Sequence, residues 1–431
     1  MCAWEEVTFE EIYEIPTRNG LNKPKRVRGS GYKMINMGEL FSYPRIRNPE
    51  MERVTLTDNE RKNFMLKPMD LLFARQSLVR EGAGKCSIVM ETPEPTCFES
   101  HLIRVRLDKN TVNPMWYFYY FMSYDGMGNV RTLVMDVAAA GIRGSELAKL
   151  KVPKPPKEIQ DKIASILSNY DELIENNSKR IALLTLMSKT IFEEWFVNFL
   201  YPGHEENNMI ESELGPIPKG WELLKIEDVL NELESGSRPK GGIDSNETAI
   251  PSIGAENILG LGIYDYSKDK FVTEEFFNGM RQGKVKSGDV LLYKDGAKVG
   301  RKSMFRDGFP HVKCCINEHV FILRSNEKCS QEFLYLWFDQ QWMTEKIKGL
   351  NANAAQPGIN RPGVKSLPIL IPADNVIKEF NIFADEIFSE IFNLAKKNNI
   401  LRQTRDLLIP KLISGELDVS ELEIEMPEEA S

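Results

Sequence analysis

The sequence is poor in the residues on which most redox and metal sites depend. Among 431 residues there are six cysteines and four histidines. The cysteines are too few and too irregularly spaced for a disulfide framework, so we expect reduced thiols. No apolar run approaches the roughly 18 residues that span a membrane, and the opening MCAWEEVTFEE is acidic where a secretory signal is basic. We therefore expect a cytoplasmic protein with no membrane association.

Catalytic motifs are also missing. The segment EGAGKCS resembles a phosphate-binding loop, but the GxxxxGK[ST] pattern would put its first glycine at Val79 and its final hydroxyl at Cys86. No glycine-rich cofactor loop follows a strand, and the histidines form no grouping that would activate a nucleophile. We expect no enzymatic activity in this chain.

One cluster needs weighing as a zinc site. Four candidate ligands lie within nine residues: His311, Cys314, Cys315 and His319. Zinc sites usually draw ligand pairs from two separated turns, whereas HVKCCINEHVFILR has the pattern of a strand with alternating faces. We favour a packed strand and no bound metal.

The sequence repeats itself at a spacing of 217 to 219 residues. WEEVTFEEI from Trp4 matches WELLKIEDV from Trp221, and Asp70 in KPMDLLF matches Asp289 in KSGDVLLY. CFESHLIRVR likewise matches CINEHVFILR, and LKVPKPP matches LPILIPA. Four matches in the same order indicate a duplication, so the molecule has two similar halves.

Each half divides into two parts. The first is rich in Gly, Pro, aromatic residues and short β-branched runs, which predicts a mixed domain dominated by strands. The second carries apolar residues at alternating steps of four and three, the seam of a coiled coil. The two seams lie 217 residues apart and comprise Ile163, Leu167, Tyr170, Ile174, Asn177, Ile181, Leu184, Ser188, Ile191 and Trp195, then Phe380, Phe383, Ile387, Ile391, Leu394, Asn398, Leu401, Arg405, Leu408 and Leu412.

Both seams contain polar residues, among them Asn177 in the first and Asn398 in the second. A polar seam residue fixes the register of a coiled coil at some cost in stability. We therefore expect the two helices, each about 35 residues long, to pair with each other. The alternative is that each helix is amphipathic and docks on its own domain.

These patterns predict an α+β fold with an internal pseudo-two-fold repeat. Two similar domains of mixed strands and helices would be separated by two long helices that form an antiparallel coiled coil. The expected boundaries are 1–153 for the first domain, 154–205 for the first helical spacer, 206–371 for the second domain, 372–415 for the second spacer and 416–431 for an acidic tail.

Most of the net charge of −8 comes from the acidic tail at residues 416–431. At face value an acidic chain argues against nucleic acid as a partner. However, seven acidic residues and no basic one lie between Glu416 and Ser431. The rest of the chain is nearly neutral, and we expect the tail to be disordered, so the objection largely disappears.

On these residues the chain resembles the specificity subunit of a type I restriction-modification system. The resemblance covers nearly the whole chain and rests on motifs that recur in order. These are an Asp-aliphatic strand with a basic Gly loop (DLLFARQSLVREGAGK, DVLLYKDGAKVGRK), a turn before the last strand (AAAGIRGSEL, AAQPGINRPGV) and a proline block that opens a helix (VPKPPKEIQ). The second proline block, LPILIPADNVIKEF, lacks the paired prolines and the Glu-Gln that follow, which leaves the start of the second helix open.

The resemblance implies a subunit without catalysis of its own. Each target-recognition domain would read one half of a bipartite site in double-stranded DNA, and the paired helices would set the spacing and hold two modification subunits. Those subunits carry S-adenosylmethionine and methylate adenine, and restriction subunits that use ATP and Mg join the same core. This chain would bind no cofactor itself.

DNA recognition needs Lys and Arg for phosphates and polar side chains for base edges. Two loops in each half supply such residues beside glycines that let the backbone approach closely. The predicted DNA-binding residues are Arg75, Gln76, Ser77, Arg80, Lys85 and Arg143 in the first half and Lys294, Lys298, Arg301, Lys302, Gln356, Asn360 and Arg361 in the second. The alternative for any one of them is a solvated hairpin turn.

Two further features predict interaction surfaces. The segment RNGLNKPKRVRGSGYK from Arg18 has six basic residues and no acidic one, which favours a phosphate-contacting arm or a flexible surface loop. Trp195 and Phe196, near the end of the first helix, predict contact with a partner protein. A scaffold that assembles with the same partners without reading DNA is the second functional hypothesis.

Overall fold

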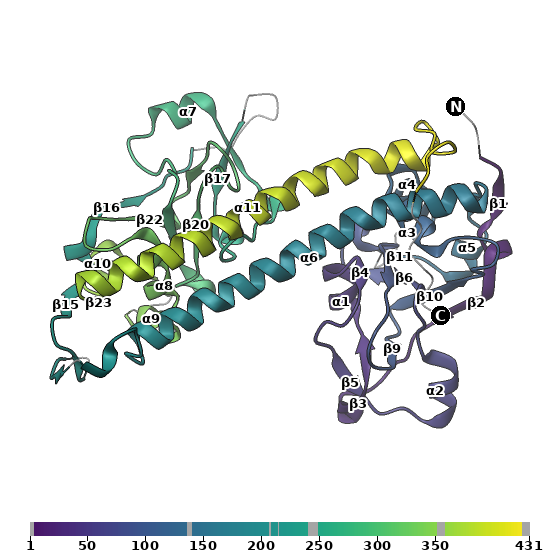
Figure 1. Cartoon of the computed structure of the whole chain (residues 1–431). Helices are drawn as coiled ribbons and strands as arrows, with labels where there is room; N and C mark the ends of the chain where they lie inside the picture. Colours follow the sequence, from purple (N-terminus) through teal and green to yellow (C-terminus); the bar gives the residue numbers. More distant parts are fainter. Residues whose placement is uncertain are drawn as a thin grey trace. The chain divides into compact units, whose positions relative to one another are not determined.

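The computed structural model describes residues 4–135, 140–206, 208–213, 215–239, 249–350 and 358–424. The chain folds into two units (Figure 1), Met1–Leu173 with Leu401–Ser431 and Ile174–Ile400. The long helices α6 (Lys157–Phe196) and α11 (Asp374–Ile413) each contribute residues to both units.

The first unit is built on a five-stranded sheet in the order β2-β10-β6-β8-β4. Its strands are β2 (Tyr13–Asn19), β4 (Arg45–Ile46), β6 (Leu71–Ala74), β8 (Cys86–Val89) and β10 (Leu102–Leu107). The central strands β6 and β10 are buried along their whole length and are apolar except for Arg104 and Arg106, which requires cover on each side of the sheet. Helix α3 (Pro114–Met122), with the sequence PMWYFYYFM, is buried except for its last residue, Met122, and packs in the same core.

The remaining elements of the first unit complete its core and loops. A second sheet has the order β5-β3-β9, β1 pairs with β12, and β7 pairs with β11. These strands are β1 (Glu6–Thr8), β3 (Arg28–Ile35), β5 (Glu52–Val54), β7 (Gln76–Ser77), β9 (Thr96–Phe98), β11 (Ala140–Gly141) and β12 (Lys151–Pro153). The shorter helices are α1 (Met37–Ser42), α2 (Asp58–Phe64), α4 (Tyr124–Arg131) and α5 (Gly144–Ala148).

The second unit repeats this plan with a four-stranded sheet in the order β16-β22-β19-β20. A second sheet has the order β18-β17-β21, β15 pairs with β23, and β13 pairs with β14. The strands are β13 (Met209–Ile210), β14 (Ile217–Pro218), β15 (Glu222–Lys225), β16 (Leu230–Ser235), β17 (Ala249–Ile253), β18 (Phe271–Thr273), β19 (Asp289–Tyr293), β20 (Lys302–Phe305), β21 (Cys315–Ile316), β22 (Val320–Ser325) and β23 (Pro368–Ile371). The helices besides α6 and α11 are α7 (Glu274–Gly279), α8 (Gln331–Asp339), α9 (Gln341–Gly349) and α10 (Arg361–Lys365).

An ion pair inside each unit confirms the duplication at atomic detail. In the first unit Arg106 of β10 holds Asp70, which directly precedes β6, through contacts of 2.6 and 2.7 Å. In the second, Arg324 of β22 holds Asp289 of β19 at the same two distances. Burial opposes the charged form of both arginines, but these ion pairs raise the pKa of Arg106 and of Arg324.

The two long helices pair, as the polar seam residues predicted. In the second unit the Asn177 side-chain amide donates to the Asn398 side-chain oxygen (3.0 Å). In the first unit Arg405 forms an ion pair with Asp171. From Asp171 to Asn177 along α6, the contact on α11 moves back from Arg405 to Asn398, so the two helices are antiparallel. Each helix has 40 residues, somewhat more than the sequence predicted.

The structure confirms one expectation about a single segment. The cysteine-rich segment contributes β21 and β22 with a turn between them, which confirms that it forms strands. Among the described residues no group of three or more His, Cys, Asp or Glu is placed to hold a metal ion, and no helix in the described ranges is long and apolar enough to cross a membrane.

The acidic tail differs from its prediction. Val419 is 1% exposed and packs in the core of the first unit, and the Lys162 ammonium donates to the Ser420 carbonyl (2.7 Å). Disorder was therefore the wrong expectation for residues 416–424, because an aliphatic side chain anchors them. Residues 425–431 lie outside the described ranges.

Candidate nucleic-acid interface

In the first unit two predicted recognition loops lie side by side. β7, which begins directly after Arg75, pairs with β11, and the Ile142 amide donates to the Arg75 carbonyl (2.9 Å). This contact brings together two segments that are far apart in the sequence. As a result, Arg75 and Arg143 line one pocket of about 400 Å³ with Thr17, Asn19, Gly144 and Ser145.

The second unit makes the same junction with different residues. The Ile359 amide donates to the Lys294 carbonyl (2.8 Å), which places Lys294 where the first unit has Arg75. Arg361 lines a pocket of about 270 Å³ with Lys365 and Asn231, and its guanidinium donates to the Gln282 side chain (2.9 Å). Both units thus present cationic and amide side chains from the same pair of loops.

A glycine closes the basic loop in each unit. Gly84 has φ +80° and Gly300 has φ +86°, a left-handed conformation that other residues rarely adopt. Their amides donate to the carbonyls of Ala74 (2.8 Å) and Tyr293 (2.9 Å), which turns the chain back into β8 and β20. The two loops differ in length, since the first runs over residues 75–84 and the second over 294–300.

The predicted DNA-binding side chains differ in exposure, and six of the thirteen are exposed to solvent. Arg75, Gln76, Ser77 and Lys294 are half-buried. The exposed members are Arg80, Arg143, Lys298, Arg301, Asn360 and Arg361. Gln356 lies outside the described residues. The solvent-facing set is consistent with a surface that contacts a polyanion.

Two predicted lysines belong to the protein interior instead. The Lys302 ammonium donates to the Phe338 carbonyl (3.0 Å) and to the Thr344 hydroxyl (2.8 Å), and burial lowers its pKa. The Lys85 ammonium donates to the Phe41 carbonyl (2.9 Å), and burial also lowers its pKa. Because both ammonium groups tie the loop base to the interior, we remove both residues from the predicted interface.

The predicted partner-binding aromatics are also placed differently. Phe196 is 2% exposed and packs against Phe192, Phe333 and Phe380 in the core of the second unit. Trp195 is half-buried against Phe380 and Phe383. The prediction that Phe196 contacts a partner protein was therefore wrong. Helix α6 is covered on one side by α11 and on another by the core of the second unit, so both Trp195, a seam residue, and its neighbour Phe196 pack inside.

The basic segment from Arg18 forms regular secondary structure and is not a flexible loop. It forms the end of β2, a short 3-10 helix (Lys25–Val27) and β3. Acidic residues from other segments neutralise several of its charges, in the ion pairs Lys23–Glu60 (2.8 Å), Arg28–Glu52 (2.7 Å) and Lys33–Glu94 (3.1 Å). The sequence showed that the basic residues are close together along the chain, but not that acidic residues from other segments form ion pairs with them.

A histidine beside each basic loop was missed as a candidate. The His101 carbonyl accepts from the Arg75 amide (2.7 Å), and the His319 carbonyl accepts from the Lys294 amide (3.0 Å). Each imidazole Nδ1 faces a carboxylate, Glu99 at 2.7 Å in the first unit and Asp295 at 2.9 Å in the second. The signal was available, since the two histidines align at a spacing of 218.

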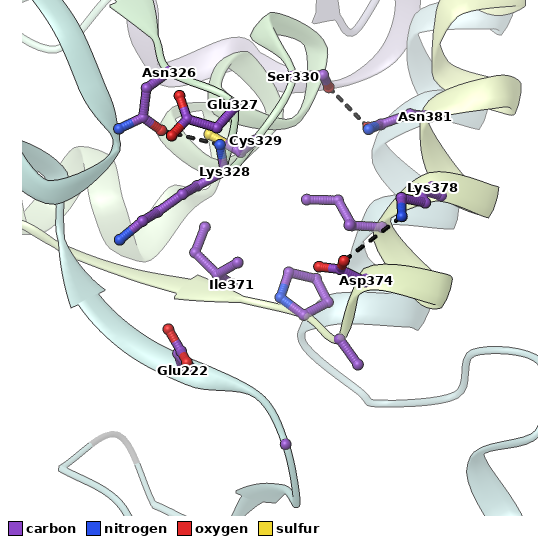
Figure 2. Close-up of a pocket in the computed structure, with 14 residues that line it drawn as sticks. Glu222, Asn326, Glu327, Lys328, Cys329, Ser330, Ile371, Asp374, Lys378 and Asn381 are labelled. Carbon is purple, nitrogen blue, oxygen red and sulfur yellow. Dashed lines mark hydrogen bonds and ion pairs between the residues drawn. The ribbon is translucent and has the colours of Figure 1, made fainter.

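The two units differ where a strand leads into a long helix. A pocket of about 470 Å³ lies at the start of α11. Figure 2 shows Glu327 and Lys328 on one side of it and Asp374 and Lys378 on the other. At the start of α6, the fully buried Gln160 side chain accepts from the Asn113 amide (2.9 Å) and donates to the Pro155 carbonyl (2.7 Å).

This difference falls where the second proline block departs from the first. Ile377 stands at the position that corresponds to Gln160 and lines the pocket. The start of the second helix, which the sequence left open, is Asp374.

Comparison with known proteins agrees with this repeated architecture. A model of the type I restriction modification DNA specificity domain matches residues 1–186 and again 218–407. The chain belongs to this family. The two matched ranges correspond to the two halves that the duplication defines.

Individual relatives carry the same description. The type I restriction enzyme MjaIX specificity subunit of Methanocaldococcus jannaschii is 29% identical over 65% of this chain and 64% of its own length, so the match spans less than two thirds of that relative. The HindI specificity subunit of Haemophilus influenzae is 21% identical over 97% of this chain and all of its own length. The crystal structure of a type I restriction-modification S subunit from M. genitalium shares the fold, with a TM-score of 0.55 and 15% identity over 95% of this chain and 96% of that one.

Proposed function

We propose that this chain is the DNA specificity subunit of a type I restriction-modification complex. The observation that carries the proposal is the repeated junction of two polar loops, one in each unit, in a chain that belongs to the DNA specificity family. Each recognition domain would read one half of a bipartite site in double-stranded DNA.

The side chains available for reading bases differ between the units. In the first, Arg143 precedes α5 and is exposed, and an arginine suits the two acceptors of guanine. In the second, Asn360 takes the same place before α10, and its side-chain oxygen already accepts from the Gly363 amide (2.8 Å). Its NH₂ group stays available for a base acceptor. Different groups at equivalent places would give the two half-sites different sequences.

The paired helices would hold the modification subunits. Several apolar side chains on their outer faces are half or more exposed: Leu183, Leu186 and Met187 on α6, and Ile382 and Ile400 on α11. Exposed aliphatic residues on helices are typical of a surface that binds other helices. Methyl transfer and ATP-driven restriction would reside in these partners, which would bind S-adenosylmethionine, ATP and Mg, while this chain would be non-catalytic.

Methylation mapping tests the proposal. The chain, assembled with modification subunits, is incubated with S-adenosylmethionine and a random-sequence DNA library, and methylated adenines are located by sequencing. We expect methylation within a motif of two defined halves separated by a constant undefined spacer. An assembled, active complex that methylates without such a motif would contradict the proposal and favour a scaffold that does not read DNA.

A further inference from the structure

The basic loop of the first unit carries an apolar tip. Leu78 is completely exposed and Val79 is 60% exposed. The corresponding loop of the second unit passes through Gly296, Ala297 and Lys298 and exposes no large apolar side chain, because its Val299 is buried (4% exposed). Single exposed aliphatic residues are common on protein surfaces, but two in succession at a loop tip bury little surface in the fold and suggest a contact outside it.

The base of the loop holds this tip outward. The Val79 amide donates to the Ser77 hydroxyl (3.2 Å), and Ser77 lies in β7, which pairs with β11. On the other side, a Cβ at Gly82 would lie 2.3 Å from the Ser77 hydroxyl oxygen, so the two arms of the loop are in close contact. Ala83 is 3% exposed and anchors the returning chain in the core. Leu78 is therefore presented by a defined backbone.

The groups around the tip match nucleic acid. Arg75 and Arg80 flank it in sequence, and Arg143 lines the adjoining pocket with Arg75. One carboxylate, Glu81, lies in the same loop, so positive charge predominates. On the base edges of the major groove, the apolar group is the C5 methyl of thymine, which aliphatic side chains contact.

We propose that Leu78 contacts a thymine methyl in the half-site read by the first recognition domain. Val79 excludes water from one side of this contact. The inference rests on the proposed function and adds an apolar specificity residue to the polar ones. It also assigns a role to the extra length of the first loop, which the second domain lacks.

The test selects DNA from a random-sequence library with the full chain assembled with its modification subunits. We expect Leu78→Ala to relax the preference for thymine at one position of one half-site by about fourfold, the effect of one methyl contact. The other half-site should not change. Val312→Ala is the matched control, because Val312 is 93% exposed in the second unit outside the basic loops, and it should leave the motif unchanged.

Uracil, which lacks the methyl group, provides the second measurement. In a fixed duplex, uracil in place of that thymine should weaken binding of the wild type by about fourfold and leave binding of Leu78→Ala unchanged. An equal effect of uracil on both proteins would overturn the inference, as would an unaltered motif in the variant. A variant that fails to assemble would show that Leu78 contacts a protein, which also overturns it. If the wild type selects no split motif, the proposed function itself fails.

Discussion

The two units keep the same interior beneath their recognition loops but differ in the loops themselves. Each unit holds an Asp-Arg pair of the same geometry between equivalent strands, and each closes the basic loop with a left-handed glycine. The first loop is longer and ends in Leu78 and Val79, whereas the second has no such tip. The comparison separates positions that the scaffold needs from positions that are free to set which DNA sequence is read.

The largest effect should come from breaking the interior pair in the first unit. Asp70→Asn leaves Arg106 buried without a carboxylate, which costs about 3–5 kcal/mol. Asp289→Asn should cost less, about 2 kcal/mol, because Arg324 also pairs with Glu232 and Glu234. Urea unfolding of the full chain, with hydrogen exchange to assign each loss to its unit, measures both. Equal losses would contradict the comparison.

The helix pair should show a similar asymmetry. In the first unit, Arg405→Leu removes the cation that pairs with Asp171, whose side chain is 8% exposed. Asp171 then keeps only its hydrogen bond from the Tyr119 hydroxyl, and we expect a loss of about 3 kcal/mol in the free energy of unfolding. Asn398→Leu in the second unit removes neutral hydrogen bonds to Asn177, to the Ile174 carbonyl and to the Ser178 hydroxyl and should cost about 1–2 kcal/mol. The free energy of unfolding of each variant provides the test, with Lys397→Ala on the same helix as a control. A larger loss for Asn398→Leu would be inconsistent with the account.

The junctions between strand and helix give a smaller, directional effect. Gln160→Ile should destabilise the first unit by about 2 kcal/mol, since the Asn113 amide and the Pro155 carbonyl both lose a partner. The reverse change, Ile377→Gln, replaces a buried core side chain (6% exposed), but one that lines a pocket where the amide can meet water, so it should cost less, about 1 kcal/mol. Thermal unfolding of the two variants decides the matter, and equal destabilisation would show that the junctions are alike.

The recognition loops should affect DNA binding without affecting folding. Arg143→Gln should weaken binding by about tenfold and relax one half-site, because the bidentate contact to guanine proposed for Arg143 would be lost. Lys298→Gln, if that lysine contacts phosphate, should weaken binding to all sequences and flatten the salt dependence. Binding isotherms at several salt concentrations distinguish the two, and a relaxed motif in Lys298→Gln would assign it to bases instead.

The sequence predicted the architecture well because the duplication provides every pattern twice. A pattern that recurs 217 residues later, such as the heptad seam with Asn177 and Asn398, is supported by two independent observations. The strand character of the cysteine segment was also predictable, since side-chain alternation is local.

The sequence predicted the site less completely, because contacts between distant segments decide it. Lys85 and Lys302 lie in loops whose composition is typical of DNA binding. However, each ammonium donates a hydrogen bond to a backbone carbonyl of another element. Phe196 follows the pattern of an exposed helix end, but the core of the second unit covers it. In the tail, the high negative charge predicted disorder. That prediction took no account of Val419, a single aliphatic residue that packs in the core of the first unit.

The most direct test of the account replaces one recognition residue in each unit, in two separate variants, and compares the DNA sequences that each variant selects. Random-sequence libraries are selected with the assembled complex carrying Arg143→Gln or Arg361→Gln. The account predicts that each variant keeps the spacer and one half-site of the wild-type motif and relaxes the other half-site, with the two variants relaxing opposite halves. Relaxation of the same half-site by both variants, or of a single continuous motif, would contradict the assignment of one half-site to each unit.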